Sequence, residues 1–215
     1  MRIKLYTKEY NQSDEPVIFL ETLSKKIICE LMGYYDDFKE NPLIYRERTL
    51  SSVIFPALMK STRRAAMEIY YNNGNRNFLD YYAMDEFREN VYLIETKHLF
   101  LEDKEKFGKF FLNRWEDLNK QFEKIEIEVV NEYIDSKKNI HAISLAVIVP
   151  WFFSEKENSL EKYTNIVKEE LKNLDWLYIY DLQDSEIYKN EFPDVDVYYP
   201  WIMLAGRIKT VEEAN

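Results

Sequence analysis

The chain has 215 residues, of which 46% are hydrophobic, 16% aromatic and 32% charged, so it holds enough apolar material for a sizeable core and is not a disordered chain. Its formal net charge of −10 argues against a nonspecific nucleic-acid coat protein, which needs a basic surface to displace counterions. Cys29 is the only cysteine, which excludes an intrachain disulfide and a cysteine-based zinc site.

The sequence carries no sign of membrane insertion or export. Its longest largely apolar stretch, residues 142–153, is shorter than the ~20 residues that a membrane-spanning helix needs. The N-terminus has no apolar region of the signal-peptide kind. We therefore expect a soluble, cytoplasmic protein that makes no membrane contact, and the length predicts a single domain over residues 1–215.

The first part of the chain is predicted to be a short strand followed by two helices. A strand-like start at residues 3–5 is followed by apolar residues at helical spacing over 16–38, and Asn41-Pro42 ends this pattern. A second helix is predicted at 50–60, where Pro56 predicts a kink or a late start.

Three strands are predicted next. Residues 64–71 and 78–84 are strand-like, and Asn72-Asn73-Gly74-Asn75 between them is a strong hairpin signal. Residues 85–90 are polar and predict a loop. Residues 91–101 are rich in Val, Ile, Leu and aromatic residues, which favours a third strand.

The remainder of the chain is predicted to alternate helices and strands. Charged and apolar residues interleave at helical spacing over 102–136, and a continuous apolar run at 142–150 is typical of a strand buried on both faces. A further amphipathic helix is predicted at 159–174, and short strands at 176–180 and 198–205. We expect an α/β protein built around a mixed sheet that helices flank.

Several kinds of functional site are absent from the sequence. The four glycines do not form a phosphate-binding loop, and no serine stands in a Gly-x-Ser-x-Gly motif. His98 and His141 have no metal-ligand spacing to another His or to Cys. Carboxylates remain as the candidates for chemistry.

The candidate carboxylates are Asp80 and Glu95, with Lys97 beside them. An acidic residue two positions before a lysine occurs five times, but only Glu95 and Lys97 interrupt a strongly apolar strand. Such charges cost stability unless they are solvated, paired or bound to a metal. Side chains 95 and 97 point to one face of the strand. Glu95 and Lys97 therefore lie within an apolar strand, whereas the other four acidic-x-lysine pairs do not.

The predicted hairpin register also brings Asp80 close to Glu95. A hairpin that closes symmetrically on Phe87-Arg88 puts Asp80 opposite Glu95, with Cβ atoms ~5 Å apart. Two facing carboxylates repel unless a cation lies between them, and a divalent metal with oxygen ligands removes that penalty. A slip of one residue would move Asp80 to the other face.

These residues resemble a known motif. Asp80, fourteen further residues and then Glu95-Thr96-Lys97, placed after a helix and a strand and before a helix and a buried strand, are similar to the PD-(D/E)XK nuclease superfamily. This is the restriction-endonuclease-like fold, whose core is a helix, three strands, a helix and a strand. The resemblance covers about residues 46–150, and Leu79 stands where the motif has its proline.

The resemblance implies Mg²⁺-dependent hydrolysis of phosphodiester bonds, in DNA more than in RNA and in a defence or repair setting, with Mn²⁺ able to substitute. Asp80 and Glu95 match the family's metal carboxylates, and Lys97 matches its catalytic lysine. Members often carry a further acid, for which Glu47 at the helix start and Glu68 on the first strand are the candidates. The core then spans residues 44–150, with an N-terminal helical addition at 1–42 and a C-terminal α/β extension at 151–215.

A basic segment precedes the carboxylates. Residues 44–79 contain six basic residues against two acidic ones. The candidates for contact with substrate phosphates are Arg46, Arg48, Arg63, Arg64 and Arg76. We predict that at least two of these five project toward the side of the sheet that holds Asp80 and Glu95. The alternative is that they are ordinary solvated charges.

Alternatives to a nuclease stay open on the sequence alone. Asp80, Glu95 and Lys97 are also explained as charge partners on a solvent-facing side of the sheet, and Glu47 as a charge that stabilises a helix dipole. The whole chain is then a non-catalytic interaction or nucleic-acid-binding subunit on the same fold, or an unrelated α/β interaction protein. Each of these alternatives is compatible with a homodimer or with a protein partner. Metal binding separates the nuclease from these alternatives.

Overall fold

The structure is a computed structural model that describes residues 3–7, 10–44, 47–72, 76–87, 89–102, 108–125, 139–153, 159–192 and 195–211. Its elements are, in chain order, β1 Ile3–Thr7, α1 Glu15–Phe38, η1 Pro42–Ile44, α2 Glu47–Ser61, β2 Arg64–Asn72, β3 Arg76–Met84, β4 Asn90–Glu102, α3 Lys109–Glu123, β5 Asn139–Trp151, α5 Leu160–Glu170, β6 Trp176–Asp181, η3 Glu186–Tyr188, β7 Lys189–Phe192, β8 Val195–Tyr198, β9 Trp201–Gly206 and β10 Ile208–Val211. These elements make a mixed α/β protein, as the sequence predicts.

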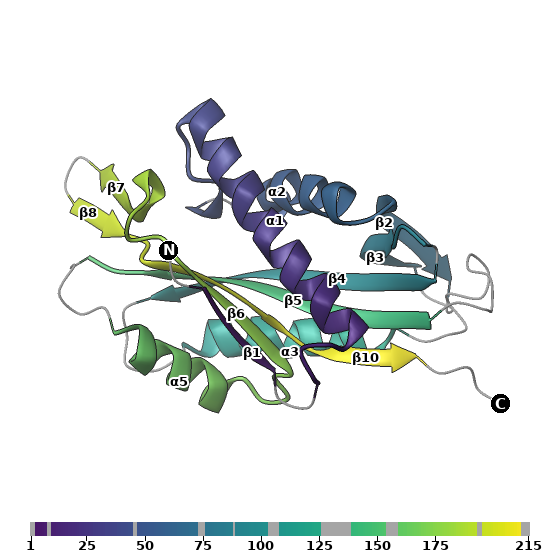
Figure 1. The fold of residues 1–215 in the computed structure, drawn as a ribbon. Helices are drawn as coiled ribbons and strands as arrows, with labels where there is room; N and C mark the ends of the chain where they lie inside the picture. The colour runs from purple at the N-terminus through teal and green to yellow at the C-terminus, as the bar shows by residue number, and fades with distance from the viewer. Residues whose placement is uncertain are drawn as a thin grey trace.

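One open sheet organises the described chain (Figure 1). Its strands lie in the order β1-β6-β9-β5-β4-β3-β2, and β10 pairs with β5. β4 and β5 are parallel, and the other strand pairs described are antiparallel. Strands from both ends of the chain, β1, β6 and β9, therefore extend the sheet that β2 to β5 begin.

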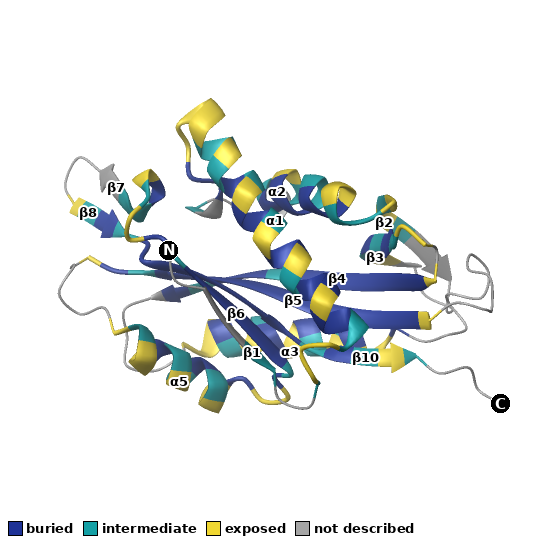
Figure 2. Cartoon of the chain, viewed as in Figure 1, coloured by how far each residue is buried: buried dark blue, intermediate teal, exposed yellow. Residues whose placement is uncertain are grey.

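Helices cover both faces of this sheet. α1 and α2 lie on one face, and α3 and α5 lie on the other (Figure 1). The side chains of β4 alternate between them: Tyr92 and Ile94 pack with α1 and α2, whereas Leu93 and Leu99 face the α3 side. β5 has helices on both faces, and its interior is buried from Ile140 to Pro150 (Figure 2). A continuous apolar run is the sequence that such a strand requires.

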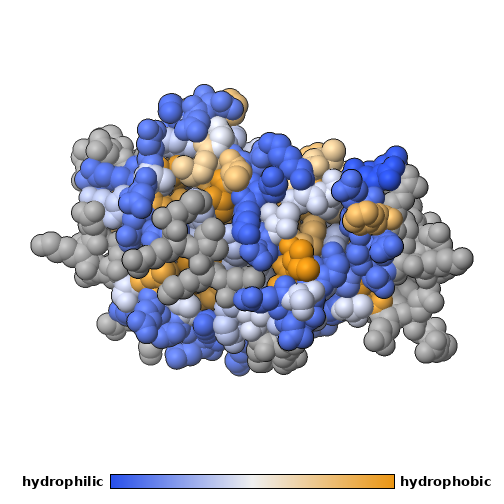
Figure 3. All heavy atoms as spheres, viewed as in Figure 1, coloured by the Kyte–Doolittle hydropathy of each residue, from blue (hydrophilic) through white to orange (hydrophobic). Residues whose placement is uncertain are grey.

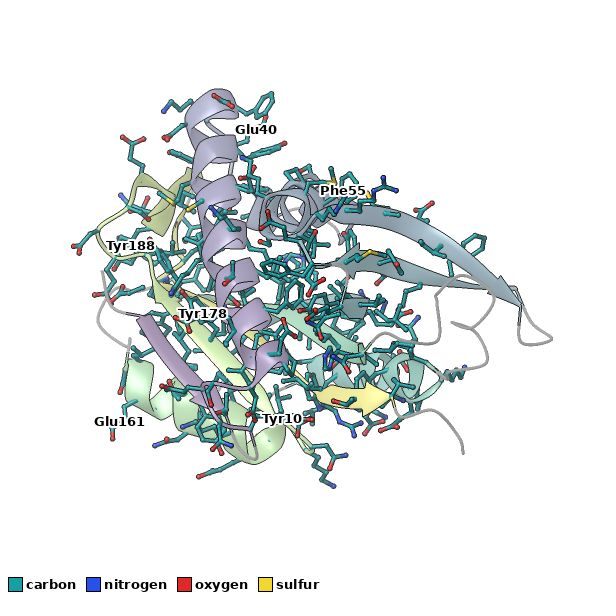
Figure 4. All side chains as sticks on the ribbon, turned by 45° about the vertical axis from the view of Figure 1, so that its right-hand side comes forward. Tyr10, Glu40, Phe55, Glu161, Tyr178 and Tyr188 are labelled. Atoms are coloured by element: carbon teal, nitrogen blue, oxygen red, sulfur yellow. The ribbon has the colours of Figure 1, made fainter. Side chains whose placement is uncertain are left out.

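Helix α1 shows why the apolar periodicity was sufficient to predict it. The residues at spacings of three and four are buried against the sheet and α2, namely Val17, Leu20, Leu23, Ile27, Ile28 and Leu31. Its start is also tied to the far end of the chain, because Tyr10 Oη donates a hydrogen bond to the backbone oxygen of Ile208 at 3.0 Å (Figure 4). Among the helices described, none has the length and apolar character that a membrane crossing requires.

Three element predictions need correction. α2 begins at Glu47, so the late start predicted from Pro56 is wrong. Its face of Leu50, Val53, Ile54, Ala57 and Leu58 is at most 3% exposed, and this packing outweighs the backbone hydrogen bond that a proline removes. The helix predicted at 102–136 is shorter, because β4 runs to Glu102 and α3 spans Lys109–Glu123. Residues 103–107 and 126–138 lie outside the described residues.

The strand predicted at 198–205 is two strands in different sheets. β8 ends at Tyr198 and pairs with β7, whereas β9 begins at Trp201 and pairs with β5 and β6. Pro200 lies between them and has no N–H to give to a ladder. The hairpin prediction is confirmed, since β2 and β3 pair from Arg64–Met84 to Asn72–Arg76, although turn residues 73–75 are not described.

Candidate functional site

The predicted register between β3 and β4 is the register of the structure. Tyr81 pairs with Ile94 and Tyr82 with Leu93, and Asp80 and Glu95 are the first residues beyond the end of this ladder. On the other side of β3, Met67 pairs with Tyr81 and Ile69 with Leu79, so Glu68 stands opposite Asp80. Glu68, Asp80 and Glu95 therefore lie at one level of β2, β3 and β4 as an acidic row, without a regular pairing that would place their side chains on one face.

The regular ladder is interrupted at this row. On the β2 side, Asp80 is unpaired although Leu79 and Tyr81 on either side of it are paired. On the β4 side the ladder ends at Tyr81–Ile94, and none of the described residues of β3 before Tyr81 pairs with β4. Glu68 has a φ of 51°, in the left-handed region that a residue other than glycine seldom adopts inside a strand. Backbone strain of this kind clusters at functional sites. Glu68 and Asp80 therefore form a local break in the β2–β3 ladder, at the level where the β3–β4 ladder ends.

Thr96 holds the Asp80 side chain in this break. Oδ2 of Asp80 accepts a hydrogen bond from the backbone N–H of Thr96 at 2.7 Å and another from its hydroxyl at 2.9 Å. Oδ1 of Asp80 has no hydrogen-bond partner among the described residues. Asp80 is half-buried, so one carboxylate oxygen is fixed and the other is left for a ligand.

Glu95 is buried, with an exposed fraction of only 2%. It lies on the α3 side of β4, between Leu93 and Leu99, and opposite Ser144 of β5. A solvent-facing charge partner is therefore excluded for this residue. A buried carboxylate needs compensation from hydrogen bonds or an opposite charge.

Lys97 shares the face of Glu95, because the two residues are separated by one position on a strand. It is half-buried, and its Nζ donates a hydrogen bond to the backbone oxygen of Thr96 at 3.0 Å. The ammonium group is thus held close to the strand at the level of the acidic row.

The structure describes the other predicted site residues only in part. Glu47 and Arg48 lie at the start of α2 and Arg76 at the start of β3, but their side chains, and the whole of Arg46, lie outside the described residues. Arg63 and Arg64 are exposed. Arg64 pairs with Met84, which packs on the α3 side with Leu93 and Phe122. Of the five arginines, Arg64 is thereby placed on the face of Glu95. That at least two of them share this side stays a prediction, because three of the five side chains lie outside the described residues.

The described residues contain no group of three or more His, Cys, Asp or Glu side chains that surrounds a single point. Glu68 is exposed, so the predicted set of Asp80, Glu95 and Glu68 is a row and not a closed cage. Magnesium is commonly held by one or two carboxylates together with water and substrate phosphates. The oxygen donors of Asp80 and Glu95 fit that kind of site.

A second polar group, which the sequence did not predict, lies on the opposite face. Tyr92 of β4 donates a hydrogen bond to Oε1 of Glu15 on α1, and Oε2 of Glu15 lies 3.7 Å from Nε2 of His141 on β5. Nδ1 of His141 is 3.3 Å from the hydroxyl oxygen of Thr210 on β10. Tyr92 and His141 stand opposite each other on parallel strands, a pairing that the sequence alone does not indicate.

Burial controls the titration of this second group. It raises the pKa of Glu15, against a smaller lowering by the Tyr92 hydrogen bond, and the charge of Asp85 raises it further. Burial also raises the pKa of Tyr92, with a further contribution from Glu15. The pKa of His141 is lowered by burial and partly restored by Asp85. Both Tyr92 and His141 are thus held neutral near pH 7.

No protein-family model, curated protein or solved structure matches this chain.

Proposed function

We propose that this protein is a metal-dependent nuclease that hydrolyses phosphodiester bonds, in DNA rather than RNA, with Mg²⁺ as its cofactor. The observation that carries the proposal is the row of Glu68, Asp80 and Glu95 across β2, β3 and β4, at the level where the β2–β3 ladder is interrupted and the β3–β4 ladder ends. A carboxylate row at a break in a sheet is costly for the fold, and a bound cation offsets that cost.

The arrangement around the row supports the proposal. α2 is followed by the antiparallel strands β2, β3 and β4, then by α3 and by β5, which runs parallel to β4. This is the order of helix, three strands, helix and strand in the core of the restriction-endonuclease-like fold that the sequence resembles. In this proposal β1, β6 and β9 are additions to that core.

Each residue has a distinct role in the proposed reaction. Asp80 and Glu95 hold the ion through carboxylate oxygens, while Thr96 keeps one Asp80 oxygen in place. When bound, the ion polarises the scissile phosphate and lowers the pKa of a coordinated water. Lys97 orients the attacking water and offsets the charge that develops on the phosphate. Arg64, exposed on the same face, holds a neighbouring phosphate.

The test is cleavage of a panel of DNA and RNA substrates with Mg²⁺ or Mn²⁺. We expect cleavage to require the metal and to be lost in Lys97→Ala while the protein stays folded. The matched control is Lys172→Ala, because Glu170 and Lys172 repeat the acidic-x-lysine spacing at an exposed helix end. Absence of cleavage across the panel with both metals contradicts the proposal and leaves the non-catalytic subunit as the better explanation of the fold.

A further inference from the structure

Thr96 has an unusual hydrogen-bonding role for a strand residue. Its backbone N–H is taken by the Asp80 side chain instead of a backbone carbonyl of β3, and its hydroxyl reaches the same oxygen. β3 and β4 remain paired up to Tyr81–Ile94, directly before this contact. The bonds from Thr96 therefore stand where the strands stop sharing ladder hydrogen bonds.

We propose that Thr96 is a positioning residue, whose N–H and hydroxyl fix Oδ2 of Asp80 so that Oδ1 is presented to a divalent cation between β3 and β4. The inference rests on the nuclease proposed above. Rotation about the Cβ–Cγ bond moves both carboxylate oxygens together, so holding Oδ2 also sets the direction of Oδ1. Two donors hold Oδ2 more firmly than one.

The contact is well placed for that role. Thr96 is only 6% exposed, so water does not compete strongly for its hydroxyl. Residues that hydrogen-bond a metal ligand orient it before the ion arrives, and their loss typically costs about 10–100-fold in metal affinity or activity. Thr96 adjoins Glu95 in β4, and their side chains point to opposite faces of the strand. In this inference one segment supplies Glu95 from one face and holds Asp80 through the backbone N–H and the hydroxyl of Thr96.

Two substitutions separate positioning from simple packing. Thr96→Val keeps the shape and removes the hydroxyl, whereas Thr96→Ser keeps the hydroxyl. Mn²⁺ affinity is measured for both variants and the parent by electron paramagnetic resonance of the free ion, and metal-free thermal stability is measured alongside. We expect Thr96→Val to bind Mn²⁺ about 10–100-fold more weakly than the parent and Thr96→Ser to bind it almost as tightly. Thr96→Ala gives the same comparison if Thr96→Val does not fold.

The outcomes distinguish this inference from the proposed function. If Thr96→Val and Thr96→Ala keep the parent's Mn²⁺ affinity while Asp80→Asn loses it, Thr96 has a structural role only, and the positioning inference is overturned while the metal site stands. If the parent and Asp80→Asn are alike in failing to bind Mn²⁺, both the site and the inference are overturned. A lowered melting temperature in Thr96→Val with unchanged affinity also counts against positioning.

Discussion

Glu15 joins helix α1 to two strands of the sheet through Tyr92 and His141. Oε2 of Glu15 and Nε2 of His141 are buried, face each other at 3.7 Å and have no hydrogen-bond partner among the described residues. The Glu15 side chain as a whole is 41% exposed, so its charge is partly screened. His141, with 7% of its side chain exposed, is the member of the pair whose titration affects stability most.

The lowered pKa of His141 predicts a pH dependence of folding. Because burial holds its native pKa below 6.5, the unfolded chain takes up this proton first. The stabilising contribution of neutral His141 is full above pH 6.5 and is lost as the pH falls toward the native pKa, with a slope of at most about 1.4 kcal/mol per pH unit. The raised pKa of Glu15 acts oppositely at lower pH, since protonated Glu15 favours the native state.

Urea denaturation at several pH values between 7.5 and 5.5 measures this effect. We expect His141→Gln to lose less stability than the parent over this range. His98 is unchanged in the variant, so the difference belongs to His141. Parallel pH profiles for the two proteins would show that His141 does not titrate differently in the native state.

Tyr92→Phe tests the hydrogen bond to Glu15. The substitution keeps the stacking on Phe19, whose ring lies 3.6 Å from that of Tyr92, and removes the donor to the carboxylate. We expect a loss of about 1–2 kcal/mol in the free energy of unfolding at pH 7.5. Tyr178→Phe is the control, because Tyr178 Oη is buried without a hydrogen-bond partner among the described residues (Figure 4). Its removal should be neutral or stabilising, and equal losses in both variants would contradict the assigned contact.

At the level of elements, β5 and β9 approach each other unusually closely at Gly206. A Cβ atom there would lie 1.7 Å from the backbone oxygen of Ser144 and 2.7 Å from its carbonyl carbon. Gly206→Ala should therefore destabilise the protein by about 3 kcal/mol or more, measured by chemical denaturation. Gly33→Ala in α1 meets nothing within 4 Å and should stabilise it by about 0.5–1 kcal/mol. Similar effects at both positions would contradict this packing.

The sequence predicted those elements whose pattern is local. Amphipathic spacing located α1 and the buried face of α2, and the polar loop after Met84 was short enough to set the register in which Tyr81 pairs with Ile94. The left-handed conformation of Glu68 and the bonds from Thr96 to Asp80 were not predictable, because they replace ladder hydrogen bonds that a regular strand would make. The contact of Glu15 with His141 depends on parallel pairing between β4 and β5, which the chain order alone does not fix.

At the scale of the whole molecule, the net charge of −10 opposes the approach of a nucleic acid. On the face in Figure 3, hydrophilic side chains cover most of the described surface. In the proposed nuclease, substrate binding therefore depends on a local group of basic residues. Arg63 and Arg64 are exposed at the start of β2, with Arg64 four residues before Glu68. The attraction of this group for phosphates has to outweigh the repulsion from the rest of the chain.

Replacing Arg64 with Gln tests that requirement. We expect weaker binding for all nucleic-acid sequences alike, and a salt dependence whose log–log slope is smaller by about one unit, because one arginine no longer neutralises a phosphate. Lys109, exposed at the start of α3, provides the control, as Lys109→Gln removes the same charge from another element. Equal effects of the two substitutions would mean that overall charge, and not a phosphate bound at Arg64, sets the affinity.

The proposed function requires that Asp80 and Glu95 share one divalent cation. A crystal structure of the Mn²⁺-soaked protein with anomalous diffraction tests this requirement most directly. We predict an anomalous peak between β3 and β4, at coordination distance from Oδ1 of Asp80 and from the Glu95 carboxylate, with Oδ2 still bonded to Thr96. Asp80→Asn should lose the peak. Ordered Asp80 and Glu95 side chains with no peak between them at saturating Mn²⁺, or a peak that persists unchanged in Asp80→Asn, would contradict it.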